Sequence, residues 1–173
     1  MRNAGLAKTV FNGIDSNYRS DSEKAYVLQI TRQTFAIYQI IDEMSTDNGI
    51  IVLDEGLCQR CLSIYLYGNS ESTKEIALYV DQIPSPDVLF HIDAEPSTCN
   101  QRLASRGYIE RLDHSVSRMQ ILQNCRFGAT TICEKLASRN VRVCEVSNDG
   151  TFDSSVQLIQ ECLDKFLKHD AAD

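Results

Sequence analysis

Acidic and polar residues directly follow three apolar segments of the sequence. In chain order these are Ile50–Leu53 with Asp54 and Glu55, Val88–Ile92 with Asp93 and Glu95, and Val141–Val146 with Asn148. An aspartate that ends an apolar strand orders Mg²⁺ and its waters near phosphate groups in phosphoryl-transfer enzymes, and a neighbouring glutamate accepts a proton from a substrate hydroxyl. We therefore predict Asp54 as an indirect Mg²⁺ ligand and Glu55 as the acceptor-side base. The alternative is that these residues only cap helices.

Arginines follow the same segments. Arg60 lies shortly after Glu55, within reach of an anionic acceptor, and Arg102 and Arg106 are four residues apart, so they share one face of a helix. Together with Arg111, these side chains would neutralise phosphoryl charge, because guanidinium groups bind phosphate in two-point geometry. The alternative is a solvated cationic helix end that complements the helix dipole.

Cys58 and Cys61 form a second motif, because two cysteines separated by two residues at the start of a helix are typical of thiol-redox proteins. A helix N-terminus and the adjacent Arg60 would lower the pKa of such a thiol. A redox role is therefore a further hypothesis, beside the simpler interpretation that both cysteines pack into a core.

Alternating apolar runs and helical periodicities surround these residues. Unbroken apolar runs predict strands covered on both faces, as in a parallel sheet. Alternation of such strands with helices predicts right-handed crossovers and helices on both faces of the sheet. The expected strands are Ile50–Leu53, Val88–Ile92 and Val141–Val146, and the expected helices span about 22–44, 57–67, 70–82, 95–106 and 115–138, with a last helix from Asp153. Residues 1–20 are poorly patterned and residues 169–173 form a tail, so we expect one domain over residues 1–173.

The order of these features resembles the thymidylate kinase-like members of the P-loop nucleoside and nucleotide kinases. The resemblance rests on the strand ending in Asp54-Glu55, the strand ending at Asp93 with a Glu-Pro turn, the helix closing on Arg106-Gly107, and the polar segment Tyr108–His114. It implies an α/β three-layer parallel sheet, ATP and Mg²⁺ as cofactors, and phosphoryl transfer to a nucleoside, nucleotide or similar small acceptor. It also implies catalytic roles for Asp54, Glu55, Arg106 and Arg111, acceptor binding by Arg60, and ATP binding by Arg102 and Asn148.

The sequence departs from this family at its beginning. The family opens with a strand and a glycine-rich loop ending in Lys-Ser or Lys-Thr, whose backbone N–H groups hold phosphate. Gly5–Thr9 ends in Lys-Thr but lacks the second glycine and the preceding strand. We therefore expect a domain without its first strands, weak ATP binding and no measurable catalysis. An inactive interaction module, with a homodimer as one form of it, is the alternative.

Composition disfavours several other classes of protein. The net charge of −7 disfavours general nucleic-acid binding, which needs a basic face. No apolar run is long enough to span a membrane. Seven dispersed cysteines, an odd number, favour free thiols in a reducing cytoplasm over a disulfide framework. The sequence thus predicts a cytoplasmic protein, and the resemblance to nucleoside and nucleotide kinases implies a small nucleotide or nucleoside as its partner.

Overall fold

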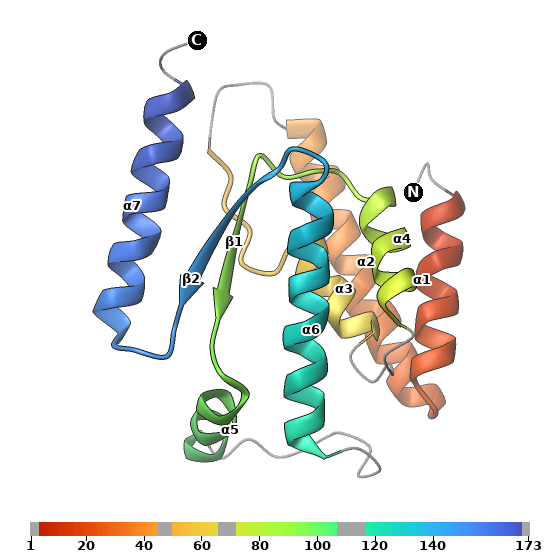
Figure 1. Ribbon diagram of the computed structural model, residues 1–173. Helices are drawn as coiled ribbons and strands as arrows, with labels where there is room; N and C mark the ends of the chain where they lie inside the picture. Colours follow the sequence, from red (N-terminus) through yellow and green to blue (C-terminus); the bar gives the residue numbers. More distant parts are fainter. Residues whose placement is uncertain (1–3, 45–49, 66–71, 107–116, 171–173) are drawn as a thin grey trace.

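The structure, a computed structural model, describes residues 4–44, 50–65, 72–106 and 117–170. Seven helices and two strands occur in these residues (Figure 1). In chain order they are α1 (Ala4–Asn17), α2 (Asp21–Met44), α3 (Leu57–Tyr65), α4 (Ser72–Gln82), β1 (Val88–Asp93), α5 (Pro96–Ser105), α6 (Arg118–Ala137), β2 (Arg142–Ser147) and α7 (Phe152–Asp170).

The predicted three-layer parallel sheet is wrong. The described residues are mostly helical, and their sheet has two strands, β1 and β2, paired in parallel. Ile50–Leu53, predicted as a strand, has irregular backbone and four exposed side chains. A strand is stable only where neighbours complete its hydrogen-bond ladder, and this segment pairs with neither β1 nor β2.

Most of the other predicted elements are confirmed. The strands at residues 88 and 142 and the helices that begin near residues 21, 57, 72, 96 and 118 lie within a few residues of their expected bounds. The segment 108–114 and Arg111 lie outside the described residues.

The N-terminal residues are more regular than their poorly patterned sequence indicated. Ala4–Asn17 forms a regular helix that buries Leu6, Val10 and Ile14. Gly13 lies inside this helix, and a Cβ atom there would come within 2.7 Å of Ile64 Cγ2 and of the Tyr65 ring. The absence of a side chain at residue 13 therefore lets α1 pack closely against α3.

The core lies among the helices. The buried apolar cluster is built from α1, α2, α3, α4 and α6, and its fully buried members include Ile64, Tyr79, Val80 and Leu136. Arg139 closes the end of α4 by donating hydrogen bonds to the carbonyl oxygens of Val80 and Ile83.

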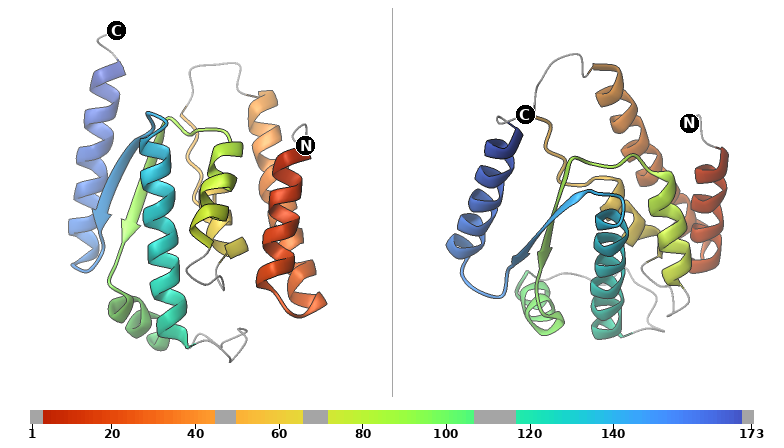
Figure 2. Two further views of the ribbon diagram at one scale, coloured as in Figure 1. Left: turned by 45° about the vertical axis from the view of Figure 1, so that its right-hand side comes forward. Right: turned by 45° about the horizontal axis from the view of Figure 1, so that its top comes forward.

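The sheet lies at one side of this helical body. Helix α6 contacts both strands, α7 packs against β2, and α5 lies at the end of the sheet toward which both strands point (Figures 1 and 2). The N-terminus is on the side of the helical body and the C-terminus on the side of α7. This arrangement places the carboxyl ends of both strands beside α5 and α6.

Candidate functional site at the carboxyl ends of the strands

The register of the sheet brings two polar segments together. Asp93 pairs with Ser147, so both strands end at the same level, and the residues that follow them become neighbours. The backbone N–H of Asn148 donates to the carbonyl oxygen of Asp93 at 2.7 Å. Their positions after apolar runs predict that Asp54, Glu55, Asp93 and Asn148 lie at one edge of the sheet. Asp93 and Asn148 do lie there, whereas Asp54 and Glu55 lie in an irregular segment outside the two strands.

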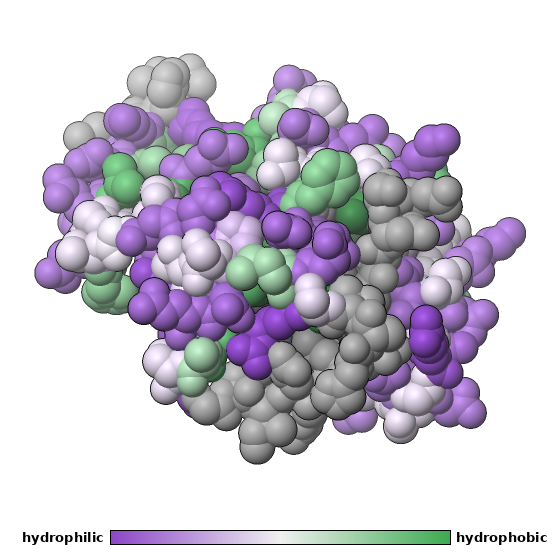
Figure 3. All heavy atoms as spheres, turned by 60° about the horizontal axis from the view of Figure 1, so that its bottom comes forward, coloured by the Kyte–Doolittle hydropathy of each residue, from purple (hydrophilic) through white to green (hydrophobic). Residues whose placement is uncertain are grey.

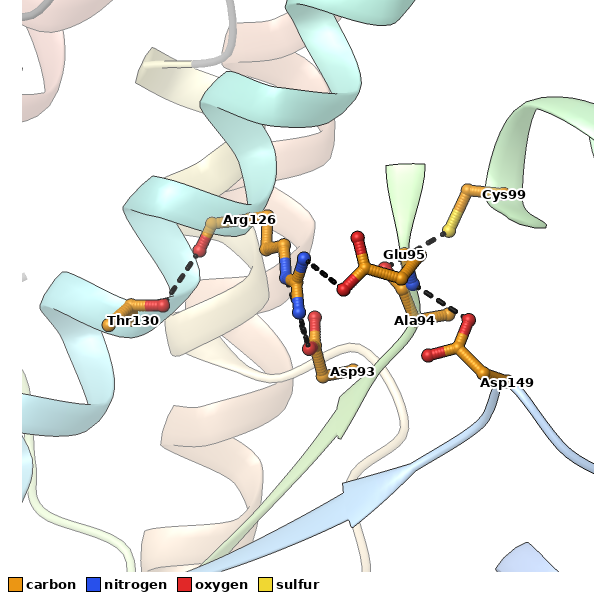
Figure 4. Close-up of polar contacts among 7 residues, drawn as sticks. All are labelled: Asp93, Ala94, Glu95, Cys99, Arg126, Thr130 and Asp149. Atoms are coloured by element: carbon orange, nitrogen blue, oxygen red, sulfur yellow. Dashed lines mark hydrogen bonds and ion pairs between the residues drawn. The ribbon is translucent and has the colours of Figure 1, made fainter. Parts of the chain in front are cut away.

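Arg126 of α6 joins the carboxylates at this edge. Its Nε and Nη2 donate to Asp93 Oδ2 at 3.1 and 2.7 Å, and its Nη1 lies 2.8 Å from Glu95 Oε1 (Figure 4). The hydrogen bonds that Arg126 donates, mainly those to Asp93 and then the one to Glu95, raise the pKa of its guanidinium. Arg126 is therefore a permanently charged bridge between the end of β1 and the start of α5.

Asp149 occupies the N-terminus of α5. Glu95 precedes the helix and provides no side-chain cap, and its backbone N–H donates to Asp149 Oδ1 at 2.9 Å instead. This hydrogen bond, a second one from Thr98, and the nearby charges of Arg126 and Arg102 lower the pKa of Asp149. A carboxylate of the chain itself thus uses the position at which a helix N-terminus attracts anions.

The cluster formed by Asp93, Glu95, Arg126 and Asp149 lies at a polar end of the molecule. Figure 3 looks toward this end, and most of the described surface there is hydrophilic. The side chains are half-exposed, with exposed fractions of 28% for Asp93, 38% for Arg126 and 56% for Glu95. The cluster is therefore accessible to a small polar ligand.

Asp54, Glu55 and Arg60 do not join this cluster. Asp54 is exposed in the irregular segment, and Glu55 Oε2 accepts a hydrogen bond from Arg60 Nη2 at 2.9 Å. Arg60 is 7% exposed and also donates to Thr34 and Ser63, so its guanidinium links α2 to α3. All three nitrogens of the Arg60 guanidinium therefore donate hydrogen bonds to side chains of the protein.

The two arginines predicted as site residues lie in the last turn of α5 and at its C-cap. Arg102 lies close enough to Asp149 to lower the pKa of that carboxyl group. Arg106 ends the helix with an exposed side chain, and its backbone N–H bonds to the carbonyl oxygens of Arg102 and Leu103.

The sequence contains no indication of Arg126, and it indicated Asp149 only as one of the polar residues that follow the last apolar run, without a role in the site. Arg126 is 33 residues from Asp93 and lies in the middle of a long helix, where its sequence context carries no signal. Asp149 directly follows Asn148, and its position after a strand was a signal for it. The contact between β1 and α6 is a tertiary feature that creates the cluster.

A preformed metal centre was not found in the described ranges: none of their His, Cys, Asp and Glu side chains forms a group of three or more that would hold an ion. Asp54, the predicted Mg²⁺ ligand, is exposed in an irregular segment and belongs to no such group of ligands among the described residues. A surface pocket lies along α2 and is lined by Ala25, Leu28, Gln29, Arg32, Gln33 and Ala36, none of which is a predicted site residue.

Comparison with known proteins adds no relative. No protein-family model matches the chain, and neither a curated protein nor a solved structure is significantly similar to it. No helix of the described residues is long and apolar enough to cross a membrane, as the sequence predicted.

Proposed function

We propose that the chain is a nucleotide-binding domain of the kinase type, related to enzymes that transfer a phosphoryl group from ATP to a nucleoside, nucleotide or similar small acceptor. The observation that supports this is the charged cluster at the carboxyl ends of β1 and β2, where ligands of parallel α/β proteins bind. The order of motifs around Asp93, Glu95 and Arg102 supports the same class.

The guanidinium of Arg126 is the group that would receive phosphate. It already binds Asp93 through two nitrogens, and phosphate oxygens satisfy the same two-point geometry. Arg102, on the adjacent helix, adds positive charge near Asp149. A phosphate group would exchange with the Asp93 and Glu95 carboxylates on Arg126.

The same arrangement limits the affinity. Three carboxylates, those of Asp93, Glu95 and Asp149, surround Arg126 and repel an incoming phosphate group. Gly5–Thr9 lies in α1, with its Thr9 carbonyl accepting from Tyr65, so it is not a phosphate-binding loop here. We therefore expect a dissociation constant for ATP·Mg²⁺ above roughly 100 μM and no measurable phosphoryl transfer.

Calorimetric titration with ATP·Mg²⁺ tests this proposal. The wild-type chain should bind weakly, and Arg126→Gln should weaken binding further, because the phosphate loses its two-point partner. Arg32→Gln is the matched control, since it removes an exposed arginine of α2 outside the cluster.

Two results would contradict the proposal. Absence of binding at millimolar nucleotide would remove the nucleotide-binding role altogether. Micromolar binding that Arg126→Gln leaves unchanged would place the nucleotide at another site and show that α1 or another segment holds the phosphates.

An interaction module is the second candidate, favoured by the exposed apolar segment Ile50–Leu53. The thiol-redox hypothesis has less support, because a redox cysteine needs an accessible thiol of low pKa. Burial raises the pKa of Cys58 to about 11 and that of Cys61 well above its ordinary value.

A further inference from the structure

Among the described residues, strand β1 pairs along one edge only, with β2. Its six residues pair with β2 in continuous parallel register from Val88–Arg142 to Asp93–Ser147. In the part of the chain that the structure describes, no other strand pairs with β1. An open edge presents backbone N–H and C=O groups that a further extended segment satisfies.

The segment Ile50–Leu53 has the complementary properties. Its side chains are 71%, 52%, 84% and 36% exposed, and it is the longest consecutive run of large exposed apolar residues among those described. β-branched Ile50, Ile51 and Val52 favour extended pairing. An unbroken apolar run is the signature of a strand that is covered on both faces, and here it lacks both the ladder and the cover.

We propose that Ile50–Leu53 of one molecule pairs with the free edge of β1 in a second copy of the chain. Each copy carries both the acceptor edge and the donor segment, and the contact closes as a two-fold symmetric dimer when each molecule donates its segment to the edge of the other. The four-residue donor segment is shorter than the six-residue strand β1, so the donor can pair along its whole length.

The lack of carboxylates favours this surface over the rest of the molecule as the place where two copies associate. Two copies with a net charge of −7 each repel one another, so association has to occur where carboxylates are absent. Ile50–Leu53 carries no charge, and β1 carries no carboxylate before Asp93 at its end. The proposal is independent of nucleotide binding, because the paired surfaces do not include Arg126.

Sedimentation velocity over about 1–200 μM protein tests the dimer. The wild type should shift from monomer to dimer as concentration rises, with a dissociation constant of micromolar order. Val52→Lys should stay monomeric over the whole range, because a charged side chain cannot enter the paired sheet. Phe152→Lys is the matched control: Phe152 is also apolar, 78% exposed and outside the proposed contact, so this variant should dimerise like the wild type.

Hydrogen exchange supplies a second measurement. Amides on the free edge of β1 should exchange more slowly at concentrations at which the wild type is dimeric, and Val52→Lys should abolish this difference. A wild type that remains monomeric at every concentration would overturn the proposal. A dimer that Val52→Lys leaves intact would equally overturn it, and so would loss of the dimer in Phe152→Lys.

Discussion

At the scale of single residues, burial decides what a side chain can do. Arg60 and Cys58 both lie at the start of α3, where sequence context predicted an anion-binding arginine and an activated thiol. The structure buries Arg60 beneath hydrogen bonds to Thr34, Ser63 and Glu55. It also surrounds Cys58 with apolar atoms that disfavour a thiolate. The same residue types thus support the packing of α3 against α2.

Cys58 should react slowly with alkylating reagents. Its pKa of about 11 lies above the ordinary value of 9.0, so its thiolate fraction at neutral pH is roughly a hundredfold below that of a free cysteine. Mass-spectrometric rates of iodoacetamide labelling at pH 7.5 measure this, with the urea-unfolded chain as the reference. Equal labelling of Cys58 in the native and unfolded chains would contradict the burial described here.

The same shift sets a pH dependence of stability. Folding raises the pKa of this thiol, so its stabilising contribution is complete below pH 9 and is lost as the pH rises toward 11. Urea unfolding should therefore show a falling free energy of unfolding over this alkaline range. A Cys58→Ala variant should show a smaller decline over the same range.

At the scale of elements, close contact between helices depends on one missing side chain. Helix α1 approaches α3 at Gly13, where a Cβ atom would overlap Ile64 and Tyr65. Gly13→Ala should therefore destabilise the protein by about 1–3 kcal/mol, the usual cost of overpacking, although alanine is the better helix former. The free energy of unfolding in urea measures the effect.

Gly5→Ala is the control for this prediction, because Gly5 is exposed in the same helix. There the change should be neutral or slightly stabilising, since helix propensity is the main effect. If Gly13→Ala were as stable as Gly5→Ala, the close approach of α1 to α3 would be disproved.

At the scale of the whole molecule, stability is unevenly distributed. The buried apolar cluster unites α1, α2, α3, α4 and α6, whereas α7 packs mainly against β2 and leaves Phe152, Val156, Leu158 and Leu167 exposed. Local opening costs least where few apolar contacts hold an element in place. The sheet side of the molecule should therefore open before the helical body.

Native-state hydrogen exchange tests this distribution. Amides in the middle of α7 should exchange at least about tenfold faster than those of α3 and α4, because opening α7 exposes less buried surface. Uniform protection across α4 and α7 would show instead that the molecule unfolds as one cooperative unit.

Sequence alone determined most helices, the two strands that form, and the neighbourhood of Asp93 and Asn148. These follow from local properties: helical periodicity, capping residues, and polar residues at the ends of apolar runs. Tertiary structure decided the rest. Ile50–Leu53 has the composition of a strand but pairs with neither β1 nor β2. Arg126 meets Asp93 only because α6 crosses β1, and Arg60 is buried because α2 lies over α3. Each of these outcomes depends on what lies beside a residue in space, and residues distant in the chain provide those neighbours.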